Sequence, residues 1–383
     1  MNLFIISGEE SGDLLGAELM DALKKHHPDI RVGGMGGVRM RKAGQEGLDS
    51  SELSVVGIVE VCEKLFVILN AFKEIKARLK RERPDCVVLI DFPDFNLRVA
   101  RAARKLGIPV VYYISPQVWA WRRGRVRTIA RLVDKMLVVF PFEVDIYKGA
   151  GVDVEYVGHP LAGRAVCDLT MEEAKKELGL PDEATVVALL PGSRTGEVKR
   201  MLPPLLKAAE LVAVDLGRSG REVRFVIPAP ASILNTELDA CLKESTVEAA
   251  VVRGRMYAAL RASEAAAVTS GTATLETALI GTPMVIIYRM SPASYRIGRA
   301  LIGVKHIGLP NIVAGRAVVP ELIQNQATAE NIARELCLML RDDSVRASME
   351  EAFGEVRAKL GGGGAPDRAA AAISKFISGL KRI

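Results

Sequence analysis

Short runs of β-branched and aliphatic residues recur along the chain, and a helix-like amphipathic stretch follows each of them. Continuous apolar strands that alternate with helices are typical of parallel sheets covered on both faces. The predicted strands of the first half are Leu3–Ile6, Cys86–Ile90, Val110–Ile114, Met136–Phe140 and Val154–Val157. Those of the second half are Thr185–Leu190, Val223–Ile227, Val247–Val252, Ala265–Thr269 and Met284–Tyr288. The pattern predicts an α/β protein with two Rossmann-like parallel sheets, whose ligand lies in a cleft facing the carboxyl ends of the strands.

The alternation restarts after the loop 158–163, and we therefore place the domain boundary there. The expected domains are residues 1–163 and residues 164–360. Residues 361–383 are expected to form a glycine hinge followed by a C-terminal helix. The length of 383 residues fits two domains at roughly 150 residues each.

Composition narrows the class of protein. A hydrophobic share of 49% excludes global disorder. The net charge of +6 is compatible with binding to phosphates, nucleic acid or an anionic membrane surface, and it does not distinguish among these partners. Five cysteines without a C-x-x-C pair predict reduced thiols rather than a disulfide framework or a zinc knuckle. The sequence has no signal-peptide pattern and no uncharged apolar run of ~18 residues, so we expect a soluble or membrane-surface protein.

Two loops of the first half carry candidate chemistry. Residues 7–13, Ser-Gly-Glu-Glu-Ser-Gly-Asp, follow a strand and open a helix, where small residues admit a substrate and the helix N-terminus favours an anion. An equally good explanation of Glu9 and Asp13 is that their negative charges only complement the helix dipole.

In residues 90–96, Asp91 ends a strand, where a general base for a hydroxyl nucleophile would lie. Asp94 or Asn96 is expected to cap the following helix.

Two loops of the second half resemble phosphate sites. In residues 189–197, Gly192 and Ser193 offer backbone amides and a hydroxyl, and Arg194 offers a bidentate guanidinium. This is neither a Walker loop nor a G-x-G-x-x-G motif, and we interpret it as a diphosphate site. In residues 269–276, Gly271 and neighbouring hydroxyls suit a phosphate, and Glu276 lies one turn on, within reach of a ribose diol. A capping box with Thr272 as cap is the competing explanation, and both remain open.

Two predicted helices carry unusual surfaces. Residues 122–135 hold six basic residues and one acidic residue, a pattern that is usually only a solvated face. Apolar positions at helical spacing between residues 61 and 79 predict a core-facing stripe. Phe66 and Val67 fall outside that stripe, so this helix has more apolar surface than one core contact needs. Four scattered histidines and the lack of a D-x-D triplet predict no metal site.

The ordered motifs together closely resemble bacterial lipid-A-disaccharide synthase over nearly the whole chain. They are S-G-E-E-S-G-D, S-x-x-G-I-V-E-V, D-F-P-D-F-N, S-P-Q-V-W-A-W, V-G-H-P, L-P-G-S-R, S-G-T-A-T-L-E and L-P-N-I-V-A-G-R. The resemblance implies a glycosyltransferase of the B type that transfers 2,3-diacylglucosamine from its UDP conjugate to the 6-hydroxyl of 2,3-diacylglucosamine 1-phosphate, with inversion. It also implies no metal or other cofactor, and a cytoplasmic protein peripheral on the inner face of the inner membrane. The first domain would hold the acceptor and lipid, and the second the UDP-sugar.

Matched to the family motifs residue by residue, the essential acid falls on Asp91 and the phosphate-binding arginine on Arg194. Glu9 is the alternative base. The nucleotide and donor-sugar residues implied are Gly192, Ser193, Ser270, Gly271, Thr272, Glu276 and Asn311, and those on the acceptor side are Ser11 and Asp94. Glu10 and Pro93 stand where family members often have Ala or Thr. Neither has a proposed role.

The acylated substrates require an apolar entry in the first domain. We expect Phe66, Val67 and Leu69 to contact lipid, and Arg122, Arg123, Arg125 and Arg127 to face anionic headgroups. Burial in the core or at a subunit interface is the alternative for the apolar residues. A UDP-sugar 2-epimerase and an RNA-binding protein are the rival functions, and we expect no nucleic-acid partner. The sequence leaves open whether the chain forms a homodimer.

Overall fold

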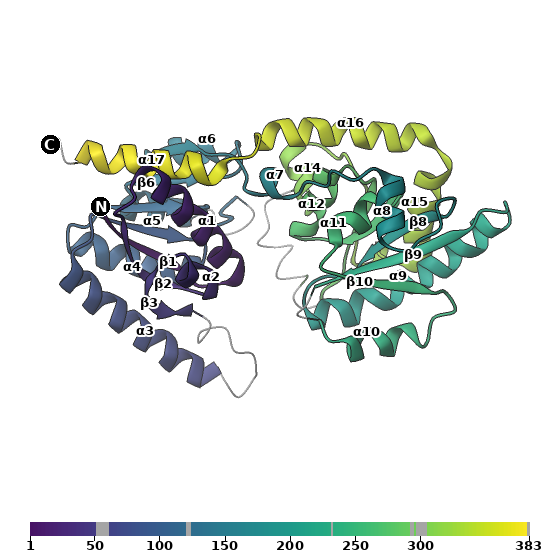
Figure 1. Cartoon of the computed structure of the whole chain (residues 1–383), viewed down its shortest axis with the longest axis horizontal. Helices are drawn as coiled ribbons and strands as arrows, with labels where there is room; N and C mark the ends of the chain where they lie inside the picture. The colour runs from purple at the N-terminus through teal and green to yellow at the C-terminus, as the bar shows by residue number, and fades with distance from the viewer. Residues whose placement is uncertain (51–60, 120–123, 231–232, 292–294, 296–304, 381–383) are drawn as a thin grey trace. The chain divides into compact units, whose positions relative to one another are not determined.

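A computed structural model of the chain describes residues 1–50, 61–119, 124–230, 233–291, 295 and 305–380. The chain divides into two compact units, residues 1–163 with 362–383, and residues 164–361. Each unit contains a parallel sheet with helices on both sides (Figure 1). The predicted α/β class with two Rossmann-like sheets is confirmed.

The first unit has, within its described residues, seven parallel strands in the order β3-β2-β1-β4-β5-β6-β7. The strands are β1 Asn2–Ser7, β2 Arg31–Gly36, β3 Glu46–Asp49, β4 Cys86–Ile90, β5 Val110–Tyr113, β6 Lys135–Val138 and β7 Asp153–Tyr156. The helices are α1 Glu10–His26, α2 Val38–Lys42, α3 Val61–Glu82, α4 Pro93–Lys105, α5 Arg125–Leu132, α6 Glu143–Lys148 and α17 Ala365–Leu380. Strands β1, β4 and β5 are buried almost throughout because both faces of the sheet are covered.

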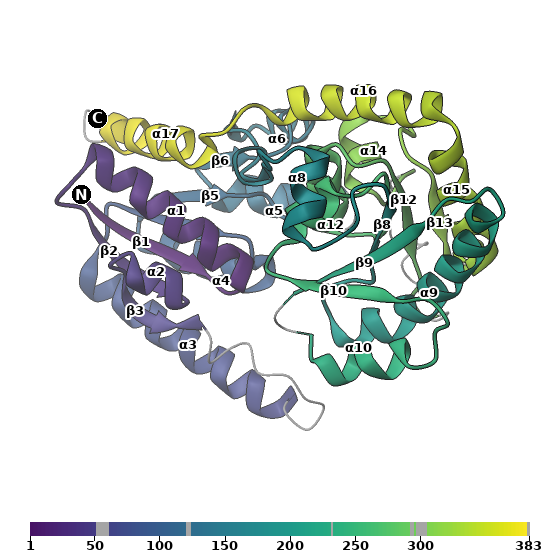
Figure 2. The same ribbon diagram turned by 45° about the vertical axis from the view of Figure 1, so that its right-hand side comes forward.

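The C-terminal helix α17 belongs to the first unit, although the second unit precedes it in the sequence. It lies along α1, which both views show (Figures 1 and 2). The Arg368 guanidinium donates to the carbonyl of Val157 at 2.8 Å, and Lys25 forms an ion pair with Asp367 at 2.8 Å. The chain therefore crosses between the units twice.

The second unit has six parallel strands in its described part, in the order β10-β9-β8-β11-β12-β13. The strands are β8 Thr185–Leu190, β9 Val223–Ala229, β10 Ala249–Arg253, β11 Ala265–Thr269, β12 Met284–Tyr288 and β13 Glu321–Ile323. The helices are α8 Met171–Glu177, α9 Thr195–Gly217, α10 Asn235–Leu242, α11 Met256–Arg261, α12 Thr272–Ile280, α14 Leu309–Ala314, α15 Ala329–Arg341 and α16 Asp343–Leu360. The short α7, Leu161–Arg164, and the 3-10 turn η2, Gln324–Gln326, complete the described elements.

Helix amphipathicity explains how the helices pack on this sheet. In α15, Ile332, Leu336 and Met339 recur at helical spacing and are buried, and Thr328 caps the helix by accepting from the amide of Asn331 at 3.2 Å. Helix α15 packs beside α9, whereas α11, α12, α14 and α16 form a second contact group. In Figure 2, α9 and α10 lie on the opposite side of the sheet from α12 and α14.

Among the strands that the structure describes, β2, β3 and β13 were not predicted. Strand β2 reads R-V-G-G-M-G and β3 reads E-G-L-D, so neither has a run of β-branched residues. The tight packing of β2 requires glycine, because a side chain on Gly34 would collide with the backbone of Ile5 on β1. The third, β13, has only three residues. Pairing with a formed sheet, rather than local propensity, decides these strands.

Candidate functional site

Strand order reverses once in each sheet, and the candidate loops follow the strands on either side of that point. In the first unit, β1 lies beside β4, with Ser7 opposite Ile90. In the second unit, β8 lies beside β11, with Leu190 opposite Val268. In open α/β sheets, ligands bind at the carboxyl ends of the strands where the order reverses. Each unit therefore has a candidate site at such an edge.

Asp91 and Glu9 come together at the edge of the first sheet. Asp91 directly follows β4 and is half-buried, whereas Glu9 is exposed at the start of α1. Burial raises the pKa of the Asp91 carboxyl, and the negative charge of Glu9 raises it further. A carboxylate with a raised pKa is a better proton acceptor than an ordinary aspartate. Asp91 thus has the position and the environment of a general base.

The capping roles expected for the neighbouring polar residues are wrong. Phe92 occupies the N-cap position of α4, and no side chain caps that helix end. Asp94 is exposed and pairs with the guanidinium of Arg125. Asn96 is buried and donates from its amide nitrogen to the carbonyls of Ile90, at 3.1 Å, and Asp91, at 2.6 Å. These contacts connect Asn96 with the backbone of the candidate base.

In the loop of residues 7–13, some side chains are exposed, whereas the side chain of Asp13 is buried and has a structural role. Ser11 is exposed, as Glu9 is. Asp13 is buried, and its carboxylate accepts from the amides of Gly37 at 2.7 Å, Arg39 at 2.9 Å and Met40 at 3.0 Å. It therefore holds the start of α2 rather than complementing the dipole of its own helix. Glu9, Glu10 and Ser11 are the exposed residues of this loop and remain available to a substrate.

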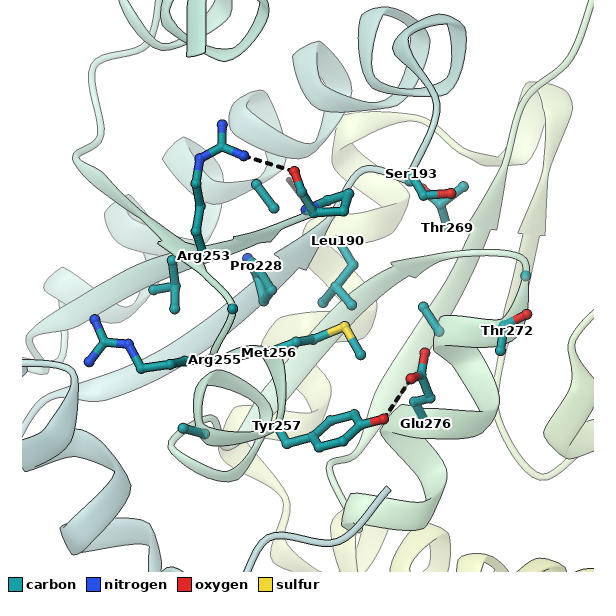
Figure 3. Close-up of a pocket in the computed structure, with 18 of the residues that line it drawn as sticks. Leu190, Ser193, Pro228, Arg253, Arg255, Met256, Tyr257, Thr269, Thr272 and Glu276 are labelled. Atoms are coloured by element: carbon teal, nitrogen blue, oxygen red, sulfur yellow. Dashed lines mark hydrogen bonds between the residues drawn. The ribbon is translucent and has the colours of Figure 1, made fainter. Parts of the chain in front are cut away.

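The second unit contains a pocket of about 830 Å³ at the edge of its sheet. Its walls come from the loops after β8, β9, β10 and β11 (Figure 3). Of the predicted nucleotide residues, it brings together Gly192, Ser193, Arg194, Ser270, Gly271, Thr272 and Glu276. It also contains residues that the sequence analysis missed, including Pro228, Arg253, Arg255, Met256 and Tyr257. Leu190, Pro228 and Met256 give this pocket an apolar wall, as Figure 3 shows.

Arg194 and Glu197 form a pair at the rim of this pocket. The Arg194 side chain is 83% exposed, and it donates to the Glu197 carboxylate at 3.1 Å. The amide of Ser193 donates to the other oxygen of the same carboxylate, also at 3.1 Å. Gly192 adopts a φ of +113°, and a side chain there would meet Glu197. The carboxylate of Glu197 thus takes two of the donors that we had expected to serve a diphosphate.

Replacement of Glu197 by Gln tests whether this carboxylate competes with a bound anion. Glu197→Gln keeps the size of the side chain and removes its negative charge. We expect UDP to bind about 2- to 5-fold more tightly, since a weak surface ion pair no longer has to be broken. Calorimetric titration with UDP measures the change. Weaker binding in the variant would instead mean that Glu197 orients Arg194 toward the nucleotide.

Glu276 faces the pocket from the first turns of α12. The hydroxyl of Tyr257 donates to its carboxylate at 2.8 Å, a contact visible in Figure 3. Burial raises the pKa of Glu276 despite this hydrogen bond. The alternative capping box with Thr272 as cap is wrong, because Gly271 is the N-cap residue and no side chain caps it. Glu276 is thus directed at the pocket rather than at its own helix end.

The structure gives Asn311 a different position from the predicted nucleotide contact. Its side chain is buried, and its oxygen accepts from the amides of Val318 at 2.7 Å and Val319 at 3.0 Å. Its nitrogen donates to the carbonyl of Val319 at 2.9 Å and to Glu321 at 2.8 Å. All its hydrogen-bonding groups are therefore occupied within the protein. The prediction that Asn311 contacts the nucleotide directly is therefore wrong, and its role in the structure is to hold the neighbouring backbone.

Glu321 connects Asn311 with the pocket loop. Its carboxylate also accepts from the amides of Ile307 and Gly308, both at 3.0 Å. The hydroxyl of Ser270 donates to the carbonyl of Ile307 at 3.1 Å. Asn311 and Glu321 therefore hold the segment that contacts Ser270. The sequence signal for this network is weak, because its members are spread over about fifty residues of chain.

Part of the expected lipid surface lies outside the described residues, namely Arg122, Arg123 and the side chain of Phe66. Val67 and Leu69 on α3 are 38% and 39% exposed. Arg127 is exposed, whereas Arg125 is largely buried and paired with Asp94. The expectation that Arg125 faces headgroups is therefore wrong. No helix in the described part of the chain combines the length and apolarity needed to cross a bilayer.

Several solved structures share this fold over nearly the whole chain. A putative UDP-N-acetylglucosamine 2-epimerase from Listeria monocytogenes is 14% identical with a TM-score of 0.64, covering 98% of this chain and 96% of that one. MnaA of S. aureus, in a co-structure with UDP, is 12% identical with a TM-score of 0.67, covering 98% and 97%. MurG of Acinetobacter baumannii is 14% identical with a TM-score of 0.58, covering 98% and 99%. At such identities these likenesses show the fold alone.

Sequence relatives are far more similar. The family model described as lipid-A-disaccharide synthetase matches residues 3–372. The lipid-A-disaccharide synthase of Syntrophus aciditrophicus is 48% identical over 370 residues, 96% of each chain. That of Geobacter metallireducens is 46% identical over 381 residues, 99% of this chain and 98% of the other. With its strand-end carboxylate, its pocket and these full-length relatives, the chain belongs to the lipid-A-disaccharide synthase family.

Proposed function

We propose that the chain transfers 2,3-diacylglucosamine from UDP-2,3-diacylglucosamine to the 6-hydroxyl of 2,3-diacylglucosamine 1-phosphate, with inversion. The products are the β-1,6-linked lipid A disaccharide 1-phosphate and UDP. The observation that carries this function is Asp91, a half-buried carboxylate with a raised pKa at the switch point of the first sheet. Two full-length relatives, at 48% and 46% identity, are named lipid-A-disaccharide synthase, which supports a lipid A disaccharide as the product.

Asp91 is the proposed general base on the acceptor side. It accepts the proton of the 6-hydroxyl as that oxygen attacks the anomeric carbon of the donor sugar. Its raised pKa improves proton acceptance, and a positioned base contributes about 10² to 10⁴ in rate. Glu9 lies near enough for its charge to act on Asp91 and remains the alternative base. Ser11 and Asp94 are the proposed acceptor contacts.

The pocket of the second unit is the proposed UDP-sugar site. The uracil ring would lie against the apolar wall of Leu190, Pro228 and Met256. Glu276 would accept from a ribose hydroxyl. The leaving diphosphate would be stabilised by Arg194 and by backbone amides at the starts of α9 and α12. To receive the diphosphate, the Ser193 amide must exchange the Glu197 carboxylate for a phosphate oxygen.

Helix α3 is the proposed lipid-contacting element, and the chain is proposed to act on the cytoplasmic face of an anionic inner membrane. Ile75 and Leu79 of this helix are buried, whereas Val67 and Leu69 are exposed. The apolar surface of this helix therefore extends beyond the stripe that contacts the core. Arg127 on α5 would add electrostatic attraction, since each basic residue near an anionic surface contributes ~1 kcal/mol.

Vesicle sedimentation tests the lipid contact. The double variant Val67→Ser, Leu69→Ser is expected to bind anionic vesicles about 10-fold more weakly, because two apolar side chains no longer enter the bilayer. Leu211→Ser, Val214→Ser is the matched control, since these residues are 37% and 59% exposed on α9 of the second unit. Equal vesicle binding by both folded variants would contradict the assignment of α3.

Thin-layer chromatography of reaction products tests the proposed function. The purified protein, given both acylated substrates, is expected to form a disaccharide 1-phosphate and UDP in equal amounts. The donor alone should remain unchanged. An epimerised UDP-sugar formed without an acceptor would contradict the proposal and favour the epimerase alternative.

A further inference from the structure

We propose that Asn96 and Tyr112 are positioning residues that aim the carboxylate of Asp91 by holding its backbone in a left-handed conformation. This inference rests on the proposed function, in which Asp91 is the base. Asn96 comes from the first turns of α4 and Tyr112 from β5, so the two side chains approach Asp91 from different elements.

The backbone at Asp91 is unusual for residues with side chains. Asp91 and Phe92 have φ angles of +44° and +47°, and Phe92 is in the left-handed helical region. Glycine adopts this region freely and aspartate or asparagine does so occasionally, but a bulky residue such as Phe92 is uncommon there. Two such residues in succession turn the chain sharply between β4 and α4. They also determine the direction in which the side chain of Asp91 leaves the strand.

Two buried side chains stabilise this turn through one carbonyl. The Asp91 carbonyl accepts from the Asn96 amide at 2.6 Å and from the Tyr112 hydroxyl at 2.7 Å. The Asn96 amide also donates to the carbonyl of Ile90 at 3.1 Å. Asn96 and Tyr112 are both 0% exposed. Because β4 ends at Ile90, the Asp91 carbonyl lies beyond the strand and obtains its partners from these side chains.

Packing of the next residue supports the same conformation. The ring of Phe92 lies 5.3 Å from that of Phe95, centroid to centroid. A side chain at position 8 would collide with the Phe92 ring, so the glycine at this position makes room for the ring. The loop after β1 and the turn after β4 therefore depend on each other. The carboxylate of Asp91 itself accepts a hydrogen bond from the backbone amide of Phe92, whereas the Asn96 and Tyr112 contacts go to the Asp91 carbonyl.

Loss of either donor should change catalysis more than stability. A turn that relaxes would move the carboxylate, and a misplacement of about 1 Å can cost about 10² in rate. We expect kcat to fall about 5- to 10-fold in Tyr112→Phe and about 100-fold in Asn96→Ala. The KM for the acceptor and the affinity for UDP should change by less than about 2-fold, as the reacting groups rather than the binding groups are moved.

The pH profile provides a readout that a general loss of stability would not move. Burial and Glu9 raise the pKa of Asp91 in the native structure. If the carboxyl turns toward solvent, its pKa falls toward the ordinary value. The acidic limb of kcat against pH should therefore shift to lower pH in both variants. Tyr147→Phe is the matched control, because it removes another buried hydroxyl, one that bonds Ser115 at 2.6 Å.

The experiment compares kcat, KM, the pH profile and thermal unfolding of the four proteins. Support requires reduced kcat and a shifted acidic limb in Tyr112→Phe, with Tyr147→Phe unchanged in both. If Asn96→Ala does not fold, Tyr112→Phe decides alone. A wild-type kcat and pH profile in Tyr112→Phe overturns the inference, as does an equal loss in Tyr147→Phe. A wild-type protein that forms no disaccharide refutes the proposed function instead.

Discussion

Asp91→Asn is expected to lower kcat by about 10² to 10⁴, because the amide keeps the shape of the carboxylate but cannot accept the hydroxyl proton. Asparagine also tolerates the left-handed backbone at this position, so the fold should survive. UDP affinity should stay unchanged, since the proposed nucleotide pocket lies wholly in the second unit. Steady-state rates with both acylated substrates, together with a UDP titration, measure these effects.

Asp145→Asn is the control for this variant, because it removes an exposed carboxylate from α6 of the same unit. In the wild type, activity should decline as the pH falls through the raised pKa of Asp91, since the protonated carboxyl cannot act as a base. Glu9→Gln removes one cause of that rise, so its acidic limb should lie at lower pH. Near-normal turnover by Asp91→Asn would transfer the role of base to Glu9.

Arg194→Ala is expected to lower kcat/KM by about 30- to 1000-fold, because a charge-assisted contact to the leaving diphosphate is lost. The side chain is exposed and forms an ion pair with Glu197, so its removal should cost little stability. Arg194→Lys keeps the charge without the bidentate fork and should be intermediate. Initial rates over a range of donor concentrations separate binding from turnover.

Arg218→Ala serves as the control for charge, because Arg218 is exposed at the far end of α9. It should behave as the wild type. Wild-type UDP affinity and turnover in Arg194→Ala would show that the loop after β8 does not hold the diphosphate. In that case, the amides at the start of α12 would be the remaining candidates.

The fold could be predicted where local pattern and tertiary structure agree. Strands such as Cys86–Ile90 and Ala265–Thr269 are continuous apolar runs because both faces of each sheet are covered. Strand β2 could not be predicted this way. Its glycines serve close packing against β1, a requirement that arises only once the sheet has formed.

The candidate site could likewise be predicted only where the local sequence pattern agrees with the tertiary structure. Glycines and polar residues directly after apolar strands point to Asp91 and Arg194 without knowledge of the fold. Local capping rules failed at Asn96 and Thr272, because tertiary partners or backbone geometry override them. Asn311 carries the motif of its family, yet its role depends on hydrogen bonds to Val318, Val319 and Glu321, which the motif does not reveal. Tyr257 was missed because only the fold brings its hydroxyl to Glu276.

The structure of the reaction product shows whether the chain transfers an acylated sugar to a specific hydroxyl with inversion. Wild-type protein is incubated with UDP-2,3-diacylglucosamine and 2,3-diacylglucosamine 1-phosphate, and the product is analysed by NMR spectroscopy. If the proposed transfer occurs, the product is a disaccharide 1-phosphate with a β linkage to the 6-position, formed at least about 100-fold more slowly when Asp91→Asn replaces the wild type. An α linkage, a different acceptor hydroxyl, or release of UDP without a disaccharide would contradict it.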